Sequence, residues 1–148
     1  MVIASIHWGG NWGHAIPAEQ REFAHRLIDE AQVDVVHGHS SHHVKAIEVY
    51  QNKPVLYGCG DFLNDYEGIG GHQSYRPDLS LMYFLRLEPT TGELRSLRMV
   101  PMRSRRFRLE RASADDTRWL EQLLDRQGRP FGTGAETTDQ GELVLRWK

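Results

Sequence analysis

Histidines gather at two places in this sequence, in a pattern typical of a metal-binding protein. The chain carries eight histidines among its 148 residues; His37, His39 and His42 fall in one short segment, whereas His7 lies near the start. Neutral imidazole is the commonest protein ligand for transition metals, because one ring nitrogen offers a lone pair near neutral pH. The pattern therefore predicts a divalent-metal site with His7, His39 and His42 as ligands.

The other histidines fit such a site less well. His37 lies within or at the end of an expected strand and would point opposite to its neighbour, so its position is equally compatible with a metal ligand and with an ordinary strand residue. His43 adjoins His42 and is expected either to face outward or to hydrogen-bond a ligand histidine. Isolated histidines are usually solvated or hydrogen-bonded side chains, and we interpret three residues in this way: His14, His25 and His72.

Four further side chains are candidates to act beside the metal. Asp61 ends a short apolar run, where its carboxylate would ligate metal, orient a histidine or accept a proton, unless it only begins an Asx turn. Asn11 and Trp12 are candidates to hold substrate, unless Trp12 simply packs its loop. Glu48 is either a buried hydrogen-bond acceptor that supports a ligand histidine or an ordinary solvent-facing strand residue.

The densest basic stretch is the arginine-rich segment 103–108. In an extended strand, Arg106 and Arg108 would share one face, while Arg103 and Arg105 would face the other way, so the four do not form a single patch. We interpret the segment as a solvated edge strand. The planar guanidinium of Arg106 is nevertheless a candidate to bind an anionic group of a substrate, either phosphate or carboxylate.

Two strands and a helix are expected to bring the histidines together. Residues 2–6 form a short apolar run, and residues 33–36 form a second one. Pro17 suits the first turn of an intervening helix. The apolar stripe of that helix consists of Phe23, Leu27 and Ala31. Strand, helix and strand in this order predict two parallel strands, with ligands collected at their carboxyl ends, and His7 and the second histidine group each follow such an end.

The rest of the chain is expected to consist of short strands and one more helix. The expected strands cover residues 46–50, 54–57, 81–87, 94–102 and 143–147. Residues 81–87 and 94–102 should form a β-hairpin. Ser113 and Asp116 have the spacing of a capping box and predict a helix that ends at Gly128.

Composition excludes several classes of protein. A chain of 148 residues is the usual size of a single domain, and its 18 basic and 20 acidic residues give a net charge of −2, so no global positive charge attracts nucleic acid. The single Cys59 excludes a disulfide-stapled module. No apolar run approaches the ~20 residues of a membrane span. Residues 2–6 begin at once as a buried strand, which is typical of an incomplete domain.

Five ordered motifs carry a family resemblance. They are Ser5-Ile6-His7-Trp8-Gly9, Pro17 with Gln20, Gly38-His39-Ser40-Ser41-His42, Ile47-Glu48-Val49-Tyr50 and Tyr57-Gly58-Cys59-Gly60-Asp61-Phe62. Together they resemble the CapA family of poly-γ-glutamate capsule-synthesis proteins, which is similar to the calcineurin-like metallophosphoesterases. The resemblance implies that His7, His39 and His42 bind metal. One histidine and the proline of the more usual Gly-His-His-Pro-His motif are absent, and Asp61 stands where many members have Asn.

The resemblance also implies a fold. It predicts an α/β protein, namely the C-terminal half of a four-layer αββα metallophosphoesterase-like sandwich with a mixed β-sheet, two main helices and β-hairpins. Residues 1–148 would then be a single, incomplete domain. The Asp-x-His and Asn-His motifs that the first half of such a fold supplies are absent here. The expected partner is therefore the missing N-terminal half or a second copy of the chain.

Two functions remain open. In the first, two divalent ions (Mn, Fe or Zn) assist hydrolysis of an anionic substrate, at a phosphoester or a γ-glutamyl bond, while His42 or His37 protonates the leaving group. In the second, the chain is a non-catalytic component of a capsule polymer complex. The segment alone is expected to be inert if half a core cannot fold unaided. A cytoplasmic location is the default, and the resemblance also allows the cell envelope.

Overall fold

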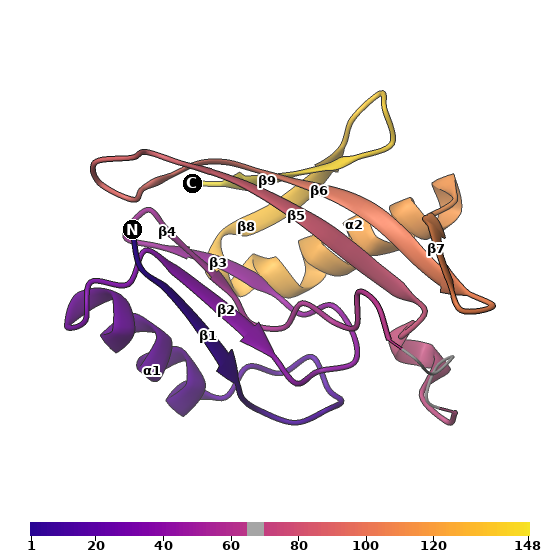
Figure 1. The fold of residues 1–148 in the computed structure, drawn as a ribbon, viewed down its shortest axis with the longest axis horizontal. Helices are drawn as coiled ribbons and strands as arrows, with labels where there is room; N and C mark the ends of the chain where they lie inside the picture. The colour runs from indigo at the N-terminus through magenta and orange to yellow at the C-terminus, as the bar shows by residue number, and fades with distance from the viewer. Residues whose placement is uncertain (65–69) are drawn as a thin grey trace.

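The computed structural model describes residues 1–64 and 70–148, and in this part of the chain it contains two β-sheets and two α-helices (Figure 1). The first sheet has the order β1 (Ile3–His7), β2 (Val35–His39), β4 (Lys53–Leu56), β3 (Ile47–Tyr50). The second sheet has the order β5 (Leu79–Leu87), β6 (Leu94–Arg105), β9 (Leu143–Trp147), β8 (Thr133–Thr137), and β7 (Arg108–Arg111) pairs with β6. The helices are α1 (Ala18–Asp29) and α2 (Ala114–Gly128), with short 3-10 helices η1 (Gln73–Tyr75) and η2 (Arg129–Phe131).

The first sheet confirms the predicted strand-helix-strand unit. β1 and β2 are parallel neighbours joined through α1, and β4 adds a third parallel strand on the other side of β2. β3 pairs antiparallel with β4, so the sheet is mixed. The carboxyl ends of β1 and β2 consequently lie side by side at one edge of the sheet, which is where the histidines were expected.

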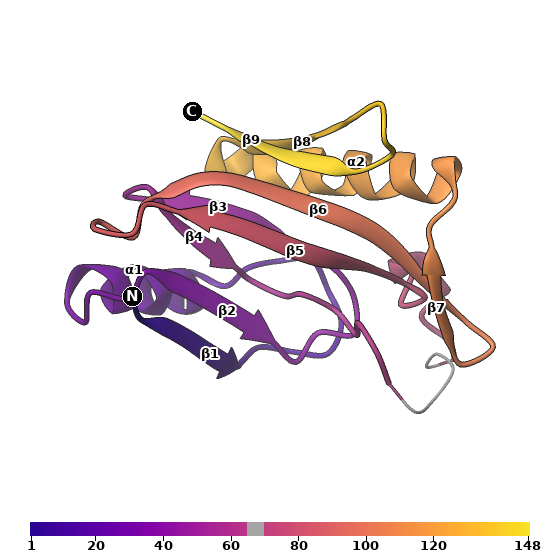
Figure 2. The ribbon, with the colours of Figure 1, turned by 45° about the horizontal axis from the view of Figure 1, so that its top comes forward.

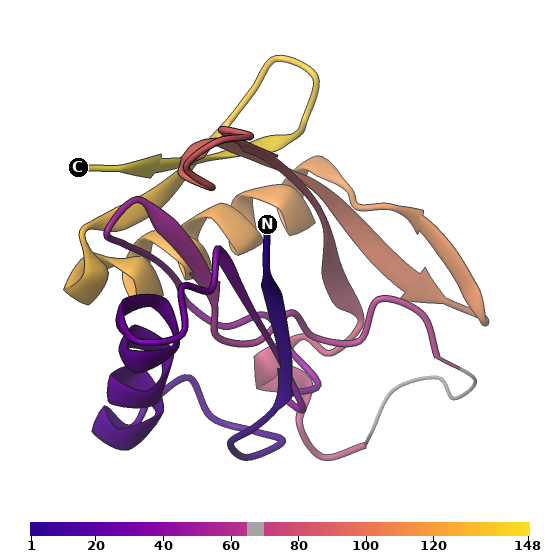
Figure 3. The ribbon, with the colours of Figure 1, turned by 60° about the vertical axis from the view of Figure 1, so that its left-hand side comes forward.

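One face of the first sheet is closed by α1 (Figure 3). The fully buried Ala24 and the nearly buried Ile28 of the helix pack against Val36 of β2 and Val55 of β4, neither of which has any exposed surface. Pro17 precedes the first helical residue without a side-chain cap, in agreement with its predicted place at the start of the helix. Helix packing therefore holds β2 and β4 from one side only.

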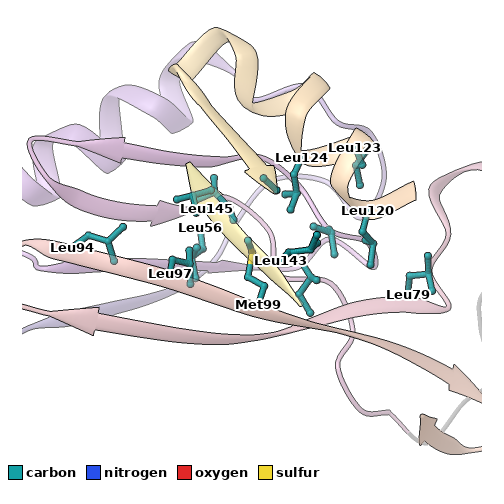
Figure 4. Close-up of a cluster of buried hydrophobic side chains, with 14 residues drawn as sticks. Leu56, Leu79, Leu94, Leu97, Met99, Leu120, Leu123, Leu124, Leu143 and Leu145 are labelled. Atoms are coloured by element: carbon teal, nitrogen blue, oxygen red, sulfur yellow. The ribbon is translucent and has the colours of Figure 1, made fainter. Parts of the chain in front are cut away.

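The other face of the first sheet meets the second sheet and α2. The larger hydrophobic core joins Ile47 and Leu56 of the first sheet to Leu97 and Met99 of β6, and α2 enters the same cluster alongside β8 and β9 (Figures 2 and 4). Three leucines of α2 point into this core: Leu120, Leu123 and Leu124. The second sheet and α2 thus cover the β3 and β4 side of the first sheet.

The β1 side of that same face is open. Ile3 of the edge strand β1 keeps 60% of its surface exposed and Val2 keeps 50%. Because strand side chains alternate between faces, Ile3 shares its face with Ser5 and His7, whereas Ala4 and Ile6 contact the α1 side. An apolar edge strand left open in this way is a surface that normally pairs with another chain segment.

Several predictions about the elements need correction. The structure confirms an α/β fold with two helices, and it confirms the β5–β6 hairpin and the Ser113 capping box of α2. His7, His37 and His39 lie inside strands, because β1 and β2 extend further than their apolar runs. The strands β7 and β8 were not predicted. The four-layer metallophosphoesterase sandwich stays a prediction.

The arginine-rich segment is also not one extended strand. Strand β6 ends at Arg105. The next two residues, Arg106 and Phe107, form a turn with positive φ, and Arg108 begins β7. The prediction that Arg106 and Arg108 share a strand face with Ser104 is therefore wrong. Two arginines of the segment instead face each other across the hairpin, since Arg105 pairs with Arg108 in its register.

The core prediction concerns Leu97, which is fully buried at the centre of the larger core. Leu97→Ala removes apolar contacts and leaves a cavity, so it should lower the free energy of unfolding by about 2–5 kcal/mol in urea denaturation. Leu63 keeps 73% of its surface exposed, and Leu63→Ala should change stability by no more than about 0.5 kcal/mol. Equal losses in the two variants would contradict the core as described.

A second stability prediction concerns the start of α2. Burial disfavours ionisation of Asp116, but hydrogen bonds from Arg76 (2.6 Å) and Ser113 (2.8 Å) outweigh it and lower the pKa of this carboxyl group. A depressed folded-state pKa contributes stability above the unfolded value of about 3.9, and this stability is lost as pH falls through the folded-state value. Asp116→Asn should therefore cost about 1.5–3 kcal/mol near neutral pH, and less in acid. A pH-independent cost in denaturation experiments would refute this account.

Candidate metal centre

His7 and His39 form the centre of the candidate site. The parallel register of β1 and β2 pairs His7 directly with His39, and their ring centroids are 5.4 Å apart with an interplanar angle of 67°. His7 is exposed and His39 is partly buried. Two imidazoles at this separation are close enough to bind the same metal ion or two adjacent ions. The structure therefore brings together two of the three predicted ligands.

His37 lies on the same face, two residues before His39. Its ring centroid is 5.7 Å from that of His39, and its Nδ1 is 3.0 Å from the hydroxyl oxygen of Ser5. Burial, and then the neighbouring His39, lower the pKa of His37. Strand alternation thus places His37 on the same face as His39, so its position allows a role beside the candidate site.

His42 is held by Asp61 in the loops that follow β2 and β4. Its Nδ1 lies 2.8 Å from Oδ2 of Asp61, and both side chains are about four-fifths buried, with 19% and 22% of their surface exposed. The backbone N–H of His42 donates to the carbonyl of Asn11 at 3.1 Å. Of the three roles considered for Asp61, this contact corresponds to orienting a histidine. When Nδ1 carries the proton toward a carboxylate, Nε2 carries the lone pair of the neutral ring.

A tryptophan fixes the backbone around these histidines. The indole N–H of Trp8 donates to the carbonyl of Tyr57 at 3.0 Å, and the two rings stack with centroids 5.9 Å apart. The indole of Trp8 passes over Gly38 to reach Tyr57. A Cβ added at Gly38 would lie 2.2 Å from Nε1 of Trp8 and 2.7 Å from two backbone carbonyl oxygens. Gly38 is therefore required so that Trp8 can reach the carbonyl of Tyr57, the residue after β4, across the strand that carries His37 and His39.

A cluster of rings around Trp12 was not predicted from the sequence. Trp12 stacks on His72 with a centroid distance of 4.0 Å and also contacts His42 at 5.4 Å and Tyr75 at 5.6 Å. The fully buried His43 lies 4.7 Å from His14, and burial lowers the pKa of His43 to about 4. The expectation that His43 faces outward is wrong. Only the folded loops bring these rings together, since no spacing in the sequence relates them.

Glu48 is buried, but it does not support the predicted ligands. Its carboxylate accepts hydrogen bonds from the hydroxyl of Tyr57 at 2.5 Å and from Nε2 of His25 at 3.1 Å, and Arg21 lies 3.5 Å away. These contacts are on the α1 face of the first sheet, opposite to His7 and His39. Glu48 therefore stabilises the attachment of α1, and the histidine that it holds is His25, in line with the interpretation of His25 as a solvated or hydrogen-bonded side chain.

The remaining candidates lie at the periphery. Asn11 is exposed and contributes its backbone carbonyl to His42, so the structure gives its side chain no established role. Arg106 is exposed on the β6–β7 turn of the second sheet, whereas His7, His37 and His39 lie on the first sheet. Trp12, by contrast, contacts His42 directly. Of the three predicted substrate-binding residues, the structure places Trp12 next to a predicted ligand.

The donor set fits part of a metal centre. Imidazole nitrogens suit Mn, Fe and Zn without choosing among them. Within residues 1–64 and 70–148, no group of three or more His, Cys, Asp and Glu side chains is arranged so that it could hold a metal ion. The neighbouring His7 and His39 therefore have the chemistry of ligands, while a complete coordination sphere would need additional groups.

Replacement of Gly38 should disrupt the anchor of Trp8. Gly38→Ala forces Trp8 off β2, so it should destabilise the protein by about 1–3 kcal/mol and change its tryptophan fluorescence. Gly10 lies in the loop after β1 that contains Trp8, and a Cβ added at Gly10 would meet only the carbonyl oxygen of Trp12, at an ordinary 3.6 Å. Gly10→Ala should therefore behave as wild type in thermal unfolding. Indistinguishable unfolding of the two variants would show that the contact across Gly38 does not matter.

Comparison with known proteins gives consistent results. The family described as "Bacterial capsule synthesis protein PGA_cap" matches residues 1–66, which contain every predicted ligand. The "Probable polyglutamine synthesis accessory protein" of Mycobacterium tuberculosis, known from two strains, is 54% identical over 145 residues, which are 98% of this chain and 38% of that protein. The "PGA biosynthesis protein CapA" of Bacillus subtilis is 32% identical over 65 residues, which are 44% of this chain and 17% of that protein.

The aligned regions indicate how much of a relative the chain represents. The "Capsule biosynthesis protein CapA" of Bacillus anthracis is 28% identical over 65 residues, which are 44% of this chain and 16% of that protein. The chain spans 38% of the length of the mycobacterial relatives. Its resemblance to CapA proteins, stated above from five motifs, agrees with these matches. The matches support the assignment of this chain to the CapA family of bacterial capsule-synthesis proteins.

Proposed function

We propose that this chain supplies the histidine half of a divalent-metal centre in a hydrolase of capsule or poly-γ-glutamate synthesis. The observation that carries the proposal is the pairing of His7 with His39, whose rings are 5.4 Å apart at the carboxyl ends of adjacent parallel strands. In an α/β sheet, this edge is where ligands bind. The paired imidazoles have no evident structural purpose, since neither belongs to a hydrophobic core cluster.

The openness of the same face supports a shared site. Val2 and Ile3 are exposed at the start of β1, the strand that ends at His7, and the second sheet covers only the β3 and β4 side of the face that His7 shares with Ile3. A segment that covered β1 would bury this apolar edge and would reach the histidines at the same time. We propose that the missing ligands, most simply carboxylate and Asn side chains, come from a further segment of the longer protein or from a second copy of the chain.

Each histidine would have a distinct task. His7 and His39 would hold the metal, and the bound ions (two in the complete protein, of Mn, Fe or Zn) would activate water and neutralise charge on an anionic substrate. Asp61 holds Nδ1 of His42, which directs its Nε2 to ligate or to transfer a proton. His37, hydrogen-bonded to Ser5, is the second candidate for proton transfer. Trp12, which contacts His42, would pack against the substrate.

The substrate class follows from the family and from the chemistry of the site. The relatives' names refer to capsule, PGA and polyglutamine synthesis. A metal-activated water can cleave a phosphoester or a γ-glutamyl amide, since both place negative charge on an oxygen that the metal stabilises. We therefore propose one of these two bonds as the target.

A non-catalytic role is the alternative. It is favoured by the lack of a three-ligand group within the described residues and by the word "accessory" in the names of the mycobacterial relatives. In this role the open β1 edge would join a capsule polymer complex, and the histidines would bind no catalytic metal. The two proposals differ in whether the full-length protein holds metal and turns over substrate.

Metal analysis of the full-length protein tests the leading proposal. His7→Ala and His39→Ala should each reduce the bound Mn, Fe or Zn severalfold, because each removes a direct ligand. His25→Ala is the matched control: it removes a histidine on the α1 face, next to Glu48. This variant should retain the wild-type metal content. Unchanged stoichiometry in both His7→Ala and His39→Ala would refute the metal centre.

Turnover separates the enzyme from the accessory component. The hydrolase proposal expects metal-dependent cleavage of either a chromogenic phosphodiester or a γ-glutamyl anilide, lost in the same two variants and kept in His25→Ala. The first substrate would identify a phosphoesterase and the second an amidase. A full-length protein without metal and without turnover of either substrate would support the accessory role.

A further inference from the structure

The β6–β7 hairpin ends in an unusual turn. Arg106 and Phe107 are its two turn residues, and their φ angles are +51° and +57°. A two-residue hairpin turn with positive φ at both positions has type I′ geometry, for which Asn-Gly is the preferred sequence. Residues with a Cβ and a bulky side chain are sterically disfavoured there. The turn therefore keeps an arginine and a phenylalanine at a conformational cost.

The flanking residues add an electrostatic cost. Arg105 and Arg108 pair directly in the register of the hairpin, and like charges in directly opposite positions destabilise a sheet. Neither has an ion-pair partner among the described residues, in contrast to Arg103 with Asp78 and Arg111 with Glu142. An anionic surface in contact with the hairpin tip would relieve this repulsion.

The tip also exposes its aromatic ring. Phe107 keeps 66% of its surface exposed, and Arg105, Arg106 and Arg108 are exposed around it. Figure 2 shows the hairpin projecting from the end of the second sheet, beyond the body of the molecule. No helix of the described residues is long and apolar enough to span a membrane. The tip thus presents an apolar end surrounded by positive charge.

We propose that the tip formed by residues 105–108 is a contact site for an anionic lipid surface. Phe107 would enter the boundary between headgroups and acyl chains, while Arg105 and Arg108 would pair with lipid phosphates. This layered arrangement matches the interface of a bilayer, where an aromatic ring lies below the charged headgroups. Each arginine near an anionic bilayer adds to the attraction, and salt weakens it.

A lipid surface explains the tip better than an acidic polymer does. A polymer of carboxylates would need the arginines but would gain little from an exposed phenylalanine in a sterically disfavoured turn. Charge alone also does not require a projecting hairpin. Only a partner with an apolar layer beneath its anionic groups uses both features of the tip.

Vesicle sedimentation with the full-length protein tests the proposal. The probe is a vesicle of equal parts phosphatidylglycerol and phosphatidylcholine, compared with pure phosphatidylcholine. Phe107→Ala should weaken partitioning into the anionic vesicles by about tenfold, in proportion to the apolar area of one phenylalanine. The reversal Arg105→Glu/Arg108→Glu should abolish it. Wild-type binding should decrease at high salt and should be weak on the neutral vesicles.

Matched variants separate the tip from general effects. Phe84→Ala removes another exposed phenylalanine, stacked with Arg98 on the sheet surface, and Arg86→Glu/Arg118→Glu makes the same change in net charge elsewhere. Both should bind like wild type. Arg106→Asn/Phe107→Gly supplies the preferred turn sequence, so it should raise thermal stability while it reduces binding.

Three outcomes would overturn the proposal. The first is no binding of the wild-type protein to the anionic vesicles. The second is equal loss of binding in the Phe84 and Phe107 variants. The third is binding of soluble polyglutamate that depends on Arg105 and Arg108 but not on Phe107, which would identify an acidic polymer as the partner of the tip.

Discussion

The parallel pairing of β1 with β2 is the constraint on which the rest of the site depends. Its register sets His7 opposite His39 and Ser5 opposite His37, so one pairing determines which side chains meet. A slip of β1 by one residue would move His7 to the α1 face, where Ala4 and Ile6 now pack, and would separate it from His39. Trp8 opposes such a slip, because its indole spans Gly38 and donates to the carbonyl of Tyr57. The site is thus positioned by backbone register first and by side chains second.

The two faces of the first sheet serve different purposes. The α1 face is closed, and even its buried charge is satisfied, since Glu48 accepts from Tyr57 and His25. The opposite face is filled by the second sheet and α2 near β3, but it is open near β1. This asymmetry is compatible with a sheet that is a stable scaffold on one face and carries the proposed half-site on the other. The proposed half-site and its proposed completing segment occupy the open part.

Much of the fold could be predicted from the sequence because its signals are local. Apolar runs and helical spacing identify β1, α1 and β2, and Ser113 with Asp116 identifies the start of α2. β8 could not be predicted in this way, because its Thr-Gly-Ala-Glu-Thr sequence lacks an apolar alternation and is buried by contact with α2. The type I′ turn at Arg106 was missed for a related reason, since the sequence there lacks the residues that such turns prefer.

The candidate site was predictable only in part. The proximity of His7 and His39 follows from strand order, which a strand-helix-strand pattern reveals. The Asp61 contact to His42 was one of three possibilities, and only the folded loops distinguish them. The partners of Glu48, His43 and Trp12 depend on tertiary packing between distant segments. Sequence patterns report which face a strand residue occupies, but they do not report which distant side chain it meets.

The central claim is that His7 and His39 share a metal centre, and the most direct measurement is a crystal structure of the full-length protein grown with Mn²⁺ or Zn²⁺, with the metal located by anomalous scattering. The account predicts an anomalous peak at a coordination distance of about 2.0–2.2 Å from a ring nitrogen of His7 or His39, with the other histidine bound to the same ion or to an adjacent one. Metal that contacts neither histidine would contradict the account.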